Sequence, residues 1–260
     1  MAVTAFQRIR IACNDIAQAV ESYQALFGFA PIWQGKRQQS GQTIAFTAWF
    51  QLENTIIELI EMSQGDPAVV GLVMSSVELD ATTSVEYHTD DQLVSLDEQQ
   101  LPANTVCDQW VSLHGEALPP AMGLVQPPSI TSDCVSRVDH IVLYTGDADA
   151  CIRAFGEEGL GIRLALDKNV PEWGGRMLFF RAGQLTLEVI EPNKGIEGDD
   201  YFWGIAFQVP DLDARLSQLK KQGVLTSDAR DGRKPGTRVA TVKSHHLNIP
   251  TLLVQPAMAV

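Results

Sequence analysis

The chain has 260 residues, of which 45% are hydrophobic and 20% charged, a balance typical of a globular protein with a substantial core. Its formal net charge is -13, and no basic cluster is longer than Lys220-Lys221, so we expect no nucleic-acid partner. The sequence has neither a signal-peptide pattern nor an apolar run long enough to span a membrane, which predicts a cytoplasmic protein without a membrane partner. Its cysteines form no C-x-x-C pair and are predicted to be reduced core residues; they are Cys13, Cys107, Cys134 and Cys151.

The sequence repeats itself with a period of about half its length. Residues 124–127 (LVQP) recur as 253–256, and residues 57–61 (IELIE) resemble residues 187–191 (LEVIE). The spacing between equivalent segments changes by only a few residues along the chain. This pattern indicates a tandem duplication with small loop changes.

In the first half, a strand over residues 6–12 is followed by Asp15, a suitable helix N-cap, and by a helix that ends at Gly28. Its predicted apolar face consists of Ala17, Val20, Tyr23 and Phe27. Three strands are expected to follow this helix and complete the first module, and the second module is degenerate. After a strand over 71–77 it shows a weak helix through 84–93, and its later strands are predicted over 110–113 and 122–125.

The second half is clearer and divides into two units. The first is βαβββ, with strands predicted over residues 138–144, 163–166, 176–182 and 184–191. The last unit has a strand over 203–209, a helix that carries Leu212, Leu216 and Leu219, and strands over 237–243 and 250–254. We therefore predict two halves, residues 1–127 and 133–260, joined by a linker at 127–129.

Four short segments of the second half are the most specific: residues 138–143 (VDHIVL), 187–192 (LEVIEP), 203–207 (WGIAF) and 233–238 (RKPGTR). With the repeated βαβββ pattern they resemble the vicinal-oxygen-chelate superfamily of glyoxalases, bleomycin-resistance proteins and dioxygenases, in an uncharacterised glyoxalase-like branch. The resemblance covers residues 4–256. It implies an α+β fold of four βαβββ modules, whose curled mixed sheets have helices outside and surround a ligand cavity.

The resemblance also implies where metal ligands would stand: near the start of the first strand of each module and on its last strand. The third module keeps both residues, His140 and Glu188, whereas the first has Arg8 and Glu58. The second module has about Leu72 and Gly123 at these positions, and the fourth has Gly204 and about Leu252. None of these side chains can coordinate a metal. A resident divalent ion needs three or four protein ligands, and this chain retains two in one sheet.

Alternation along the strands places His140 on one face with Val142 and Tyr144, and Glu188 on one face with Thr186 and Ile190. Both His140 and Glu188 can therefore point into the cavity. One interpretation is a catalytic acid/base pair or a divalent metal site. The alternative is a structural His–Glu hydrogen bond inherited from a metal-binding ancestor. His245 and His246 could serve as replacement ligands, although adjacent loop histidines are more often solvated.

In the first half, Arg8 and Glu58 would form an ion pair in the place of the lost metal, because a buried cation needs a carboxylate partner. The alternative is that Arg8 holds a carboxylate of the ligand.

Aromatic and cationic residues of the second half are predicted to bind a flat or anionic ligand. Trp203 is favoured because the missing side chain of Gly204 leaves room beside it, and Arg238 follows a Pro-Gly turn at the rim of a strand. The full predicted set of ligand-binding residues is Tyr144, Trp173, Arg176, Phe180, Trp203 and Arg238.

Two functions of different class remain open. One is a metal-assisted lyase, isomerase or dioxygenase in which His140 and Glu188 are catalytic. The other is a metal-free protein that binds or sequesters a small aromatic or anionic compound, as bleomycin-resistance proteins do. The sequence leaves the pairing of modules open, and it permits a monomer or a homodimer.

Overall fold

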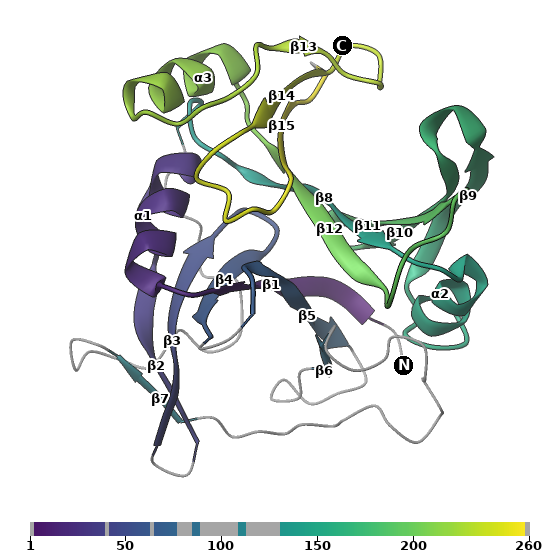
Figure 1. Ribbon diagram of the computed structural model, residues 1–260, viewed down its shortest axis with the longest axis horizontal. Helices are drawn as coiled ribbons and strands as arrows, with labels where there is room; N and C mark the ends of the chain where they lie inside the picture. Colours follow the sequence, from purple (N-terminus) through teal and green to yellow (C-terminus); the bar gives the residue numbers. More distant parts are fainter. Residues whose placement is uncertain are drawn as a thin grey trace.

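The computed structural model describes residues 3–39, 42–62, 65–76, 85–88, 109–112 and 131–257. These residues form two curved β-sheets with helices packed outside them (Figure 1). The predicted α+β class, with mixed sheets and few helices, is confirmed.

The first sheet is built from strands that precede residue 113. Its strand order is β6-β5-β1-β4-β3-β2-β7. The bounds are β1 (Val3–Cys13), β2 (Trp33–Gln39), β3 (Gln42–Gln51), β4 (Ile56–Glu61), β5 (Ala68–Ser76), β6 (Val85–His88) and β7 (Gln109–Ser112). Helix α1 (Ile16–Phe27) connects β1 to β2.

The second sheet contains the strands that follow residue 131, in the order β13-β14-β15-β12-β8-β11-β10-β9. These are β8 (Arg137–Tyr144), β9 (Arg163–Val170), β10 (Gly175–Ala182), β11 (Leu185–Pro192), β12 (Tyr201–Gln208), β13 (Arg230–Asp231), β14 (Arg238–Val242) and β15 (Thr251–Gln255). The helices are α2 (Ala148–Phe155) and α3 (Leu212–Lys221), with a 3-10 turn η1 (Pro171–Trp173). The sheet curls, so that its β13–β14 and β9–β10 ends both rise from the centre (Figure 1).

The pairing of modules follows from the two antiparallel contacts at the sheet centres. Strand β1 pairs with β5, and β8 pairs with β12. The first strands of the first and second modules are therefore neighbours, as are those of the third and fourth. The sequence left open which modules pair with one another, and the two ladders show that the pairs are the first with the second and the third with the fourth.

Each helix begins at an aspartate, because its carboxylate accepts a backbone N–H of the first turn. Asp15, Asp147 and Asp211 accept from residues 18, 150 and 214. Helix α1 ends at Gly28, which has a φ of 91° and donates its N–H to Gln24. The buried face of α1 differs from the prediction, since Ala17 is exposed; its buried residues are Ala19, Tyr23, Leu26 and Phe27.

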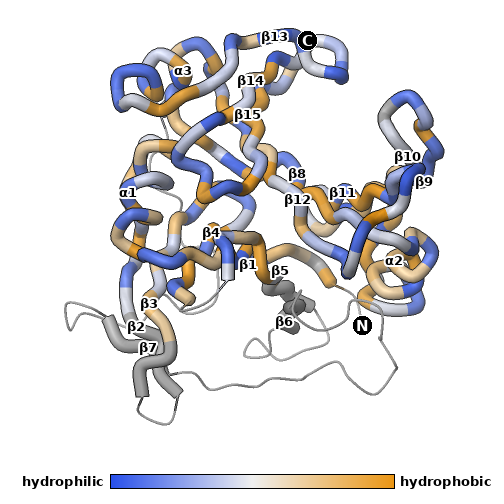
Figure 2. The backbone as a smooth tube through the Cα atoms, in the orientation of Figure 1, coloured by the Kyte–Doolittle hydropathy of each residue, from blue (hydrophilic) through white to orange (hydrophobic). Residues whose placement is uncertain are grey.

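One hydrophobic core joins the two halves on the helix-covered faces of the sheets. Phe27 at the end of α1 packs edge-on against Phe207 of β12, with ring centroids 5.0 Å apart. Hydrophobic residues recur along β1, β8 and β11, whereas the ends of β9 and β10 are hydrophilic (Figure 2). The cysteines Cys13, Cys134 and Cys151 are buried and free, and Cys107 lies outside the described residues.

Two β-bulges interrupt the central β8–β12 ladder. His140 pairs with Ala206 and Val138 with Phe207, so Asp139 is an extra residue of β8. Leu143 pairs with Phe202 and Val142 with Gly204, so Trp203 is an extra residue of β12. A bulge places two consecutive side chains against one of the partner strand and turns them toward one face.

The second module departs from its prediction where a weak helix was expected over 84–93, because β6 is a strand there. The predicted strand 122–125 and linker 127–129 lie outside the described residues, so the boundary between the halves stays a prediction. Within the described ranges, no helix has the length and hydrophobicity needed to cross a membrane.

Candidate functional site

The candidate site lies on the face of the second sheet that is turned away from α2 and α3, here called the distal face. It carries His140 and Tyr144 of β8, Glu188 of β11 and Trp203 of β12. In the parallel β8–β11 ladder, His140 pairs with Thr186 and Val142 with Glu188. His140 and Glu188 are therefore diagonal neighbours on one face.

His140 stands between two carboxylates. Its Nδ1 lies 2.7 Å from Oδ2 of Asp139, and its Nε2 lies 3.6 Å from Oε2 of Glu188. The first contact is a hydrogen bond, whereas the second is too long for one. The His140 and Glu188 side chains are 24% and 15% exposed, so a ligand atom can approach both from solvent.

Asp139 fixes the orientation of the imidazole. Its Oδ1 accepts a hydrogen bond from Nε2 of Gln208 on β12, while its Oδ2 faces Nδ1 of His140. With Nδ1 engaged in this way, the other ring nitrogen is directed at Glu188. An imidazole oriented by a carboxylate is the usual arrangement for a histidine that donates or accepts a proton.

The charges around His140 shift three pKa values. Burial alone would lower the pKa of His140, but the hydrogen bond with Asp139 and the charge of Glu188 outweigh it and raise the pKa. Burial raises the pKa of Glu188, and the nearby charges of His140 and Arg233 only partly oppose it. For Asp139, burial is outweighed by the hydrogen bonds from His140 and Gln208, which lower its pKa.

An aromatic cluster adjoins this pair. Tyr144 stacks on Trp203 with ring planes 7° apart and centroids 5.7 Å apart, and it contacts Tyr201 edge-on at 5.6 Å. Trp203 and Tyr201 remain 43% and 41% exposed. Burial, Tyr201 and Glu188 together raise the pKa of Tyr144, so the cluster lies within electrostatic reach of the polar pair.

Two cations of the loop between β13 and β14 act on the same groups. Arg233 lowers the pKa of Glu188 and of Tyr144 against the raising effect of their burial, and Lys234 does the same to Asp139. The sequence indicated this segment through the RKPGTR motif, but it singled out Arg238 rather than Arg233. A solvent-exposed loop cation has no hydrophobic periodicity that would mark its position.

The room expected beside Gly204 is filled. A Cβ at Gly204 would lie 2.5 Å from the carbonyl oxygen of Pro250 and 3.1 Å from its Cβ. The glycine is therefore required by the close approach of Pro250, and no ligating side chain could stand there. Leu252 lies in an apolar cluster with Ala206, Val239 and Val254.

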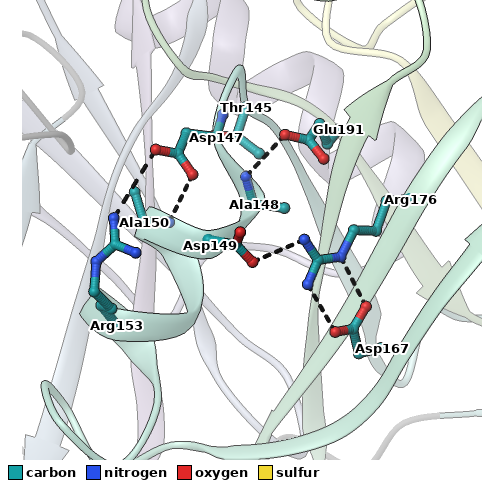
Figure 3. Close-up of polar contacts among 9 residues, drawn as sticks. All are labelled: Thr145, Asp147, Ala148, Asp149, Ala150, Arg153, Asp167, Arg176 and Glu191. Carbon is teal, nitrogen blue, oxygen red and sulfur yellow. Dashed lines mark hydrogen bonds and ion pairs between the residues drawn. The ribbon is translucent and has the colours of Figure 1, made fainter.

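Three predicted ligand-binding residues lie on the helix-covered face instead. Arg176 forms a bidentate ion pair with Asp167 and reaches Asp149 of α2 at 2.8 Å (Figure 3). Arg238 is held by Asp213 of α3 at 2.6 Å. Phe180 is fully buried against Phe155 of α2. The side chain that lies opposite Glu188 in the β10–β11 ladder is Phe179.

The other candidates are less informative. Trp173 ends η1, and its side chain lies outside the described ones. His245, with a φ of 61°, bonds Ser244 through Nδ1 at 2.8 Å.

The donor set does not fit a resident divalent ion. In the part of the chain that the structure describes, no three His, Cys, Asp or Glu side chains come together as metal ligands. His140 and Glu188 offer two donors, and Asp139 is engaged by His140 and Gln208. Protein sites for zinc or iron have three or more such ligands.

The equivalent position in the first half is filled by its own side chains. Glu58 is fully buried and lies 3.7 Å from Arg8 and 3.0 Å from Arg10, and it accepts a hydrogen bond from Trp49 at 3.2 Å. The guanidinium of Arg8 lies over the Trp49 ring. The predicted Arg8–Glu58 ion pair is present, and Arg10, which follows two residues later on the same face, joins it.

Comparisons with known proteins agree with the resemblance that the sequence indicated. Residues 139–241 match the model of the Glyoxalase/Bleomycin resistance protein/Dioxygenase superfamily. A mutant of 4-hydroxymandelate synthase from Streptomyces coelicolor aligns over 99% of this chain and 94% of its own, with 14% identity and a TM-score of 0.64. Methylmalonyl-CoA epimerase from Mycobacterium tuberculosis aligns over 47% of this chain and 89% of its own, with 22% identity and a TM-score of 0.40. No curated protein sequence matches.

Proposed function

We propose that this chain, whose C-terminal half belongs to the glyoxalase, bleomycin-resistance and dioxygenase superfamily, binds a small aromatic anion on the distal face of its second sheet. The observation that carries the proposal is the pair formed by Nε2 of His140 and Oε2 of Glu188. The two atoms face each other at 3.6 Å beside the half-exposed ring of Trp203.

The chemistry around the pair favours a planar ligand with an anionic group. The stack of Trp203 on Tyr144 offers a rigid aromatic surface, on which a flat ring gains dispersion and quadrupole contacts. The loop cations Arg233 and Lys234 supply positive charge next to it, and the carboxylate neighbours of His140 raise the pKa of its imidazole and so favour the protonated ring. Because the donor set does not suit a resident divalent ion, we propose binding without a metal.

A second candidate is an enzyme of the lyase or isomerase type that moves a proton without a metal. It is favoured by the approach of His140 to Glu188 at 3.6 Å and by the upward shift of both pKa values, which makes Glu188 a stronger base than an exposed carboxylate. His140 would donate a proton to a ligand oxygen while Glu188 removes one from a neighbouring carbon. Metal-dependent dioxygenase chemistry would need a third ligand beside His140 and Glu188, and the described residues provide none.

Binding can be tested with benzoate as the probe. Backbone amide and aromatic NMR signals are followed up to millimolar benzoate, with cyclohexanecarboxylate and benzyl alcohol as matched controls that lack the ring or the charge. Saturable shifts at His140, Tyr144 and Trp203 are expected for benzoate, and Trp203→Leu should weaken its binding about tenfold. Shifts scattered over the surface, or equal effects of all three compounds, would refute the proposed ligand class.

Metal content separates the metal-free proposal from the alternative. We expect purified wild-type protein and His140→Ala to contain equally little divalent metal. A stoichiometric ion in the wild type that is lost in His140→Ala would instead support a metal-assisted enzyme.

We also infer a cytoplasmic protein that acts as a monomer or homodimer. The residues of the site all come from one sheet of one chain, so a second copy is not needed to complete it. Light scattering of the purified protein measures the oligomeric state directly.

A further inference from the structure

The turn between β3 and β4 of the first sheet reaches across to the strand that carries His140. The backbone N–H of Glu53 donates to the carbonyl of Ser136 at 2.9 Å, just before β8 begins. Asn54, the next residue, contacts β8 itself. The first half therefore contacts β8, the strand that carries His140, at the N-terminal end of that strand.

The Asn54 carboxamide satisfies both backbone groups of Val138. Its Nδ2 donates to the Val138 carbonyl at 2.8 Å, and its Oδ1 accepts the Val138 N–H at 3.0 Å. The neighbouring strand β11 pairs with β8 only from His140 onward, where Thr186 is its partner. Asn54 thus takes the place of the missing strand neighbour for Val138.

Val138 is the residue immediately before the bulge. The bulge turns Asp139 toward the distal face, where it holds Nδ1 of His140. Because side chains alternate with a period of two, moving the bulge by one residue would send Asp139 or His140 to the helix-covered face. A fixed Val138 therefore determines which two side chains face the site.

We propose that Asn54 is a positioning residue, which holds the β8 bulge in register and thereby directs His140 at Glu188. The first half, whose own equivalent position is filled by Arg8, Arg10 and Glu58, would then serve the site of the second half. The proposal rests on the site described above as the place of function. It concerns the orientation of His140, so it can be tested without any ligand.

The contact needs an amide. Asparagine presents a donor and an acceptor side by side, as a backbone peptide does. Aspartate at this position would keep the acceptor but turn a carboxylate oxygen toward the Val138 carbonyl. Alanine would remove the hydrogen-bond partners of both the N–H and the carbonyl of Val138. Nδ2 of Asn54 also donates to the Gln184 carbonyl at 3.2 Å, and Gln184 in turn accepts from Arg137 at the start of β8.

The test compares Asn54→Ala and Asn54→Asp with wild type in the 260-residue chain. Glu53→Ala is the matched control, because this exposed side chain is removed while the backbone hydrogen bond to Ser136 stays. Two quantities are measured by NMR: the side-chain 15N and 1H signals of His140, and the exchange rate of the Val138 amide. The ring signals report the hydrogen bond between Nδ1 and Asp139, which overall stability alone does not change.

We expect both Asn54 variants to lose the hydrogen-bonded Nδ1 signal of His140 and to exchange the Val138 amide about tenfold faster. Glu53→Ala should leave both unchanged. A folded Asn54 variant with wild-type His140 signals would overturn the proposal, and if Asn54→Ala does not fold, Asn54→Asp decides. Absence of benzoate binding in wild type would refute the proposed function but leave this result untouched.

Discussion

Asp139 and His140 are consecutive residues of β8, yet their side chains meet on one face with Oδ2 and Nδ1 2.7 Å apart. Consecutive side chains of a regular strand point to opposite faces. The bulge at Asp139 removes that separation and gives the imidazole a carboxylate partner from its own strand. The acid/base properties of His140 therefore depend on its immediate neighbour as well as on Glu188.

The first prediction concerns the pKa of His140 and its dependence on Asp139. The hydrogen bond and the Glu188 charge raise this pKa against burial, so the imidazole C–H signals should titrate with a midpoint above 6.5. Asp139→Asn removes one of the two negative charges and should lower the midpoint. A midpoint that stays the same in Asp139→Asn would contradict this account.

The same shift predicts how stability depends on pH. A histidine whose folded pKa lies above its unfolded value stabilises the folded state fully below the unfolded pKa, and this stabilisation is lost as pH rises through the folded pKa. The loss of unfolding free energy in Asp139→Asn should thus be larger at about pH 5.5 than at about pH 9. Urea unfolding at the two pH values measures the difference, and equal losses would exclude the proposed ionic contribution.

Gly204→Ala should destabilise the protein by about 2–3 kcal/mol, because the new Cβ would lie 2.5 Å from the Pro250 carbonyl oxygen. Backbone atoms of two neighbouring strands cannot separate without loss of their hydrogen bonds. Gly146→Ala is the matched control, since its Cβ would lie 3.6 Å from Ile196, an ordinary contact. Chemical unfolding compares the two, and equal stability of both variants would show that β12 and β15 adjust freely.

Much of the second half could be predicted from its sequence. Aspartate N-caps and alternating apolar residues located β8, β10, β11 and β12, and alternation placed His140 and Tyr144 on one face. A sequence signal for the β8 bulge was also present, because the apolar residues Val138 and Ile141, both buried in the core, stand three positions apart where regular alternation requires two. Alternation read as an average pattern does not detect such a single extra residue.

The faces of the other candidates could not be obtained in this way. The prediction for Arg176, Phe180 and Arg238 rests on the chemistry of their side chains, which does not determine which face of a sheet each side chain occupies. Phe179 rather than Phe180 faces Glu188 because of the β10–β11 register, which one sequence does not determine. The contact of Asn54 with Val138 joins residues 84 positions apart and has no local sequence signal.

Truncation of Phe180 should mainly lower the stability of the protein, whereas truncation of its neighbour Phe179 should mainly weaken ligand binding. Phe180→Ala removes a fully buried ring packed on Phe155 and should cost about 3–5 kcal/mol of unfolding free energy. Phe179→Ala should cost much less, because its side chain is only partly buried, but should weaken the binding of benzoate. Unfolding curves and benzoate titrations of both variants check the assignment; similar unfolding costs would contradict the faces described for β10.

Arg215 of α3 is predicted to be a structural link between the two halves. Its buried guanidinium donates to the carbonyl of Asp133 at 3.0 Å and to the carbonyl of Ala25 near the C-terminus of α1, where carbonyls lack helical partners. Arg215→Met keeps an unbranched stem but removes these donors, so it should lower the unfolding free energy by about 2–3 kcal/mol.

Arg153→Met on α2 is the control, because that side chain is 61% exposed and its ion pair is 3.9 Å long, and it should change stability by less than about 0.5 kcal/mol. Equal effects of the two substitutions in urea unfolding would show that the Arg215 contacts do not stabilise the junction of α1 and α3.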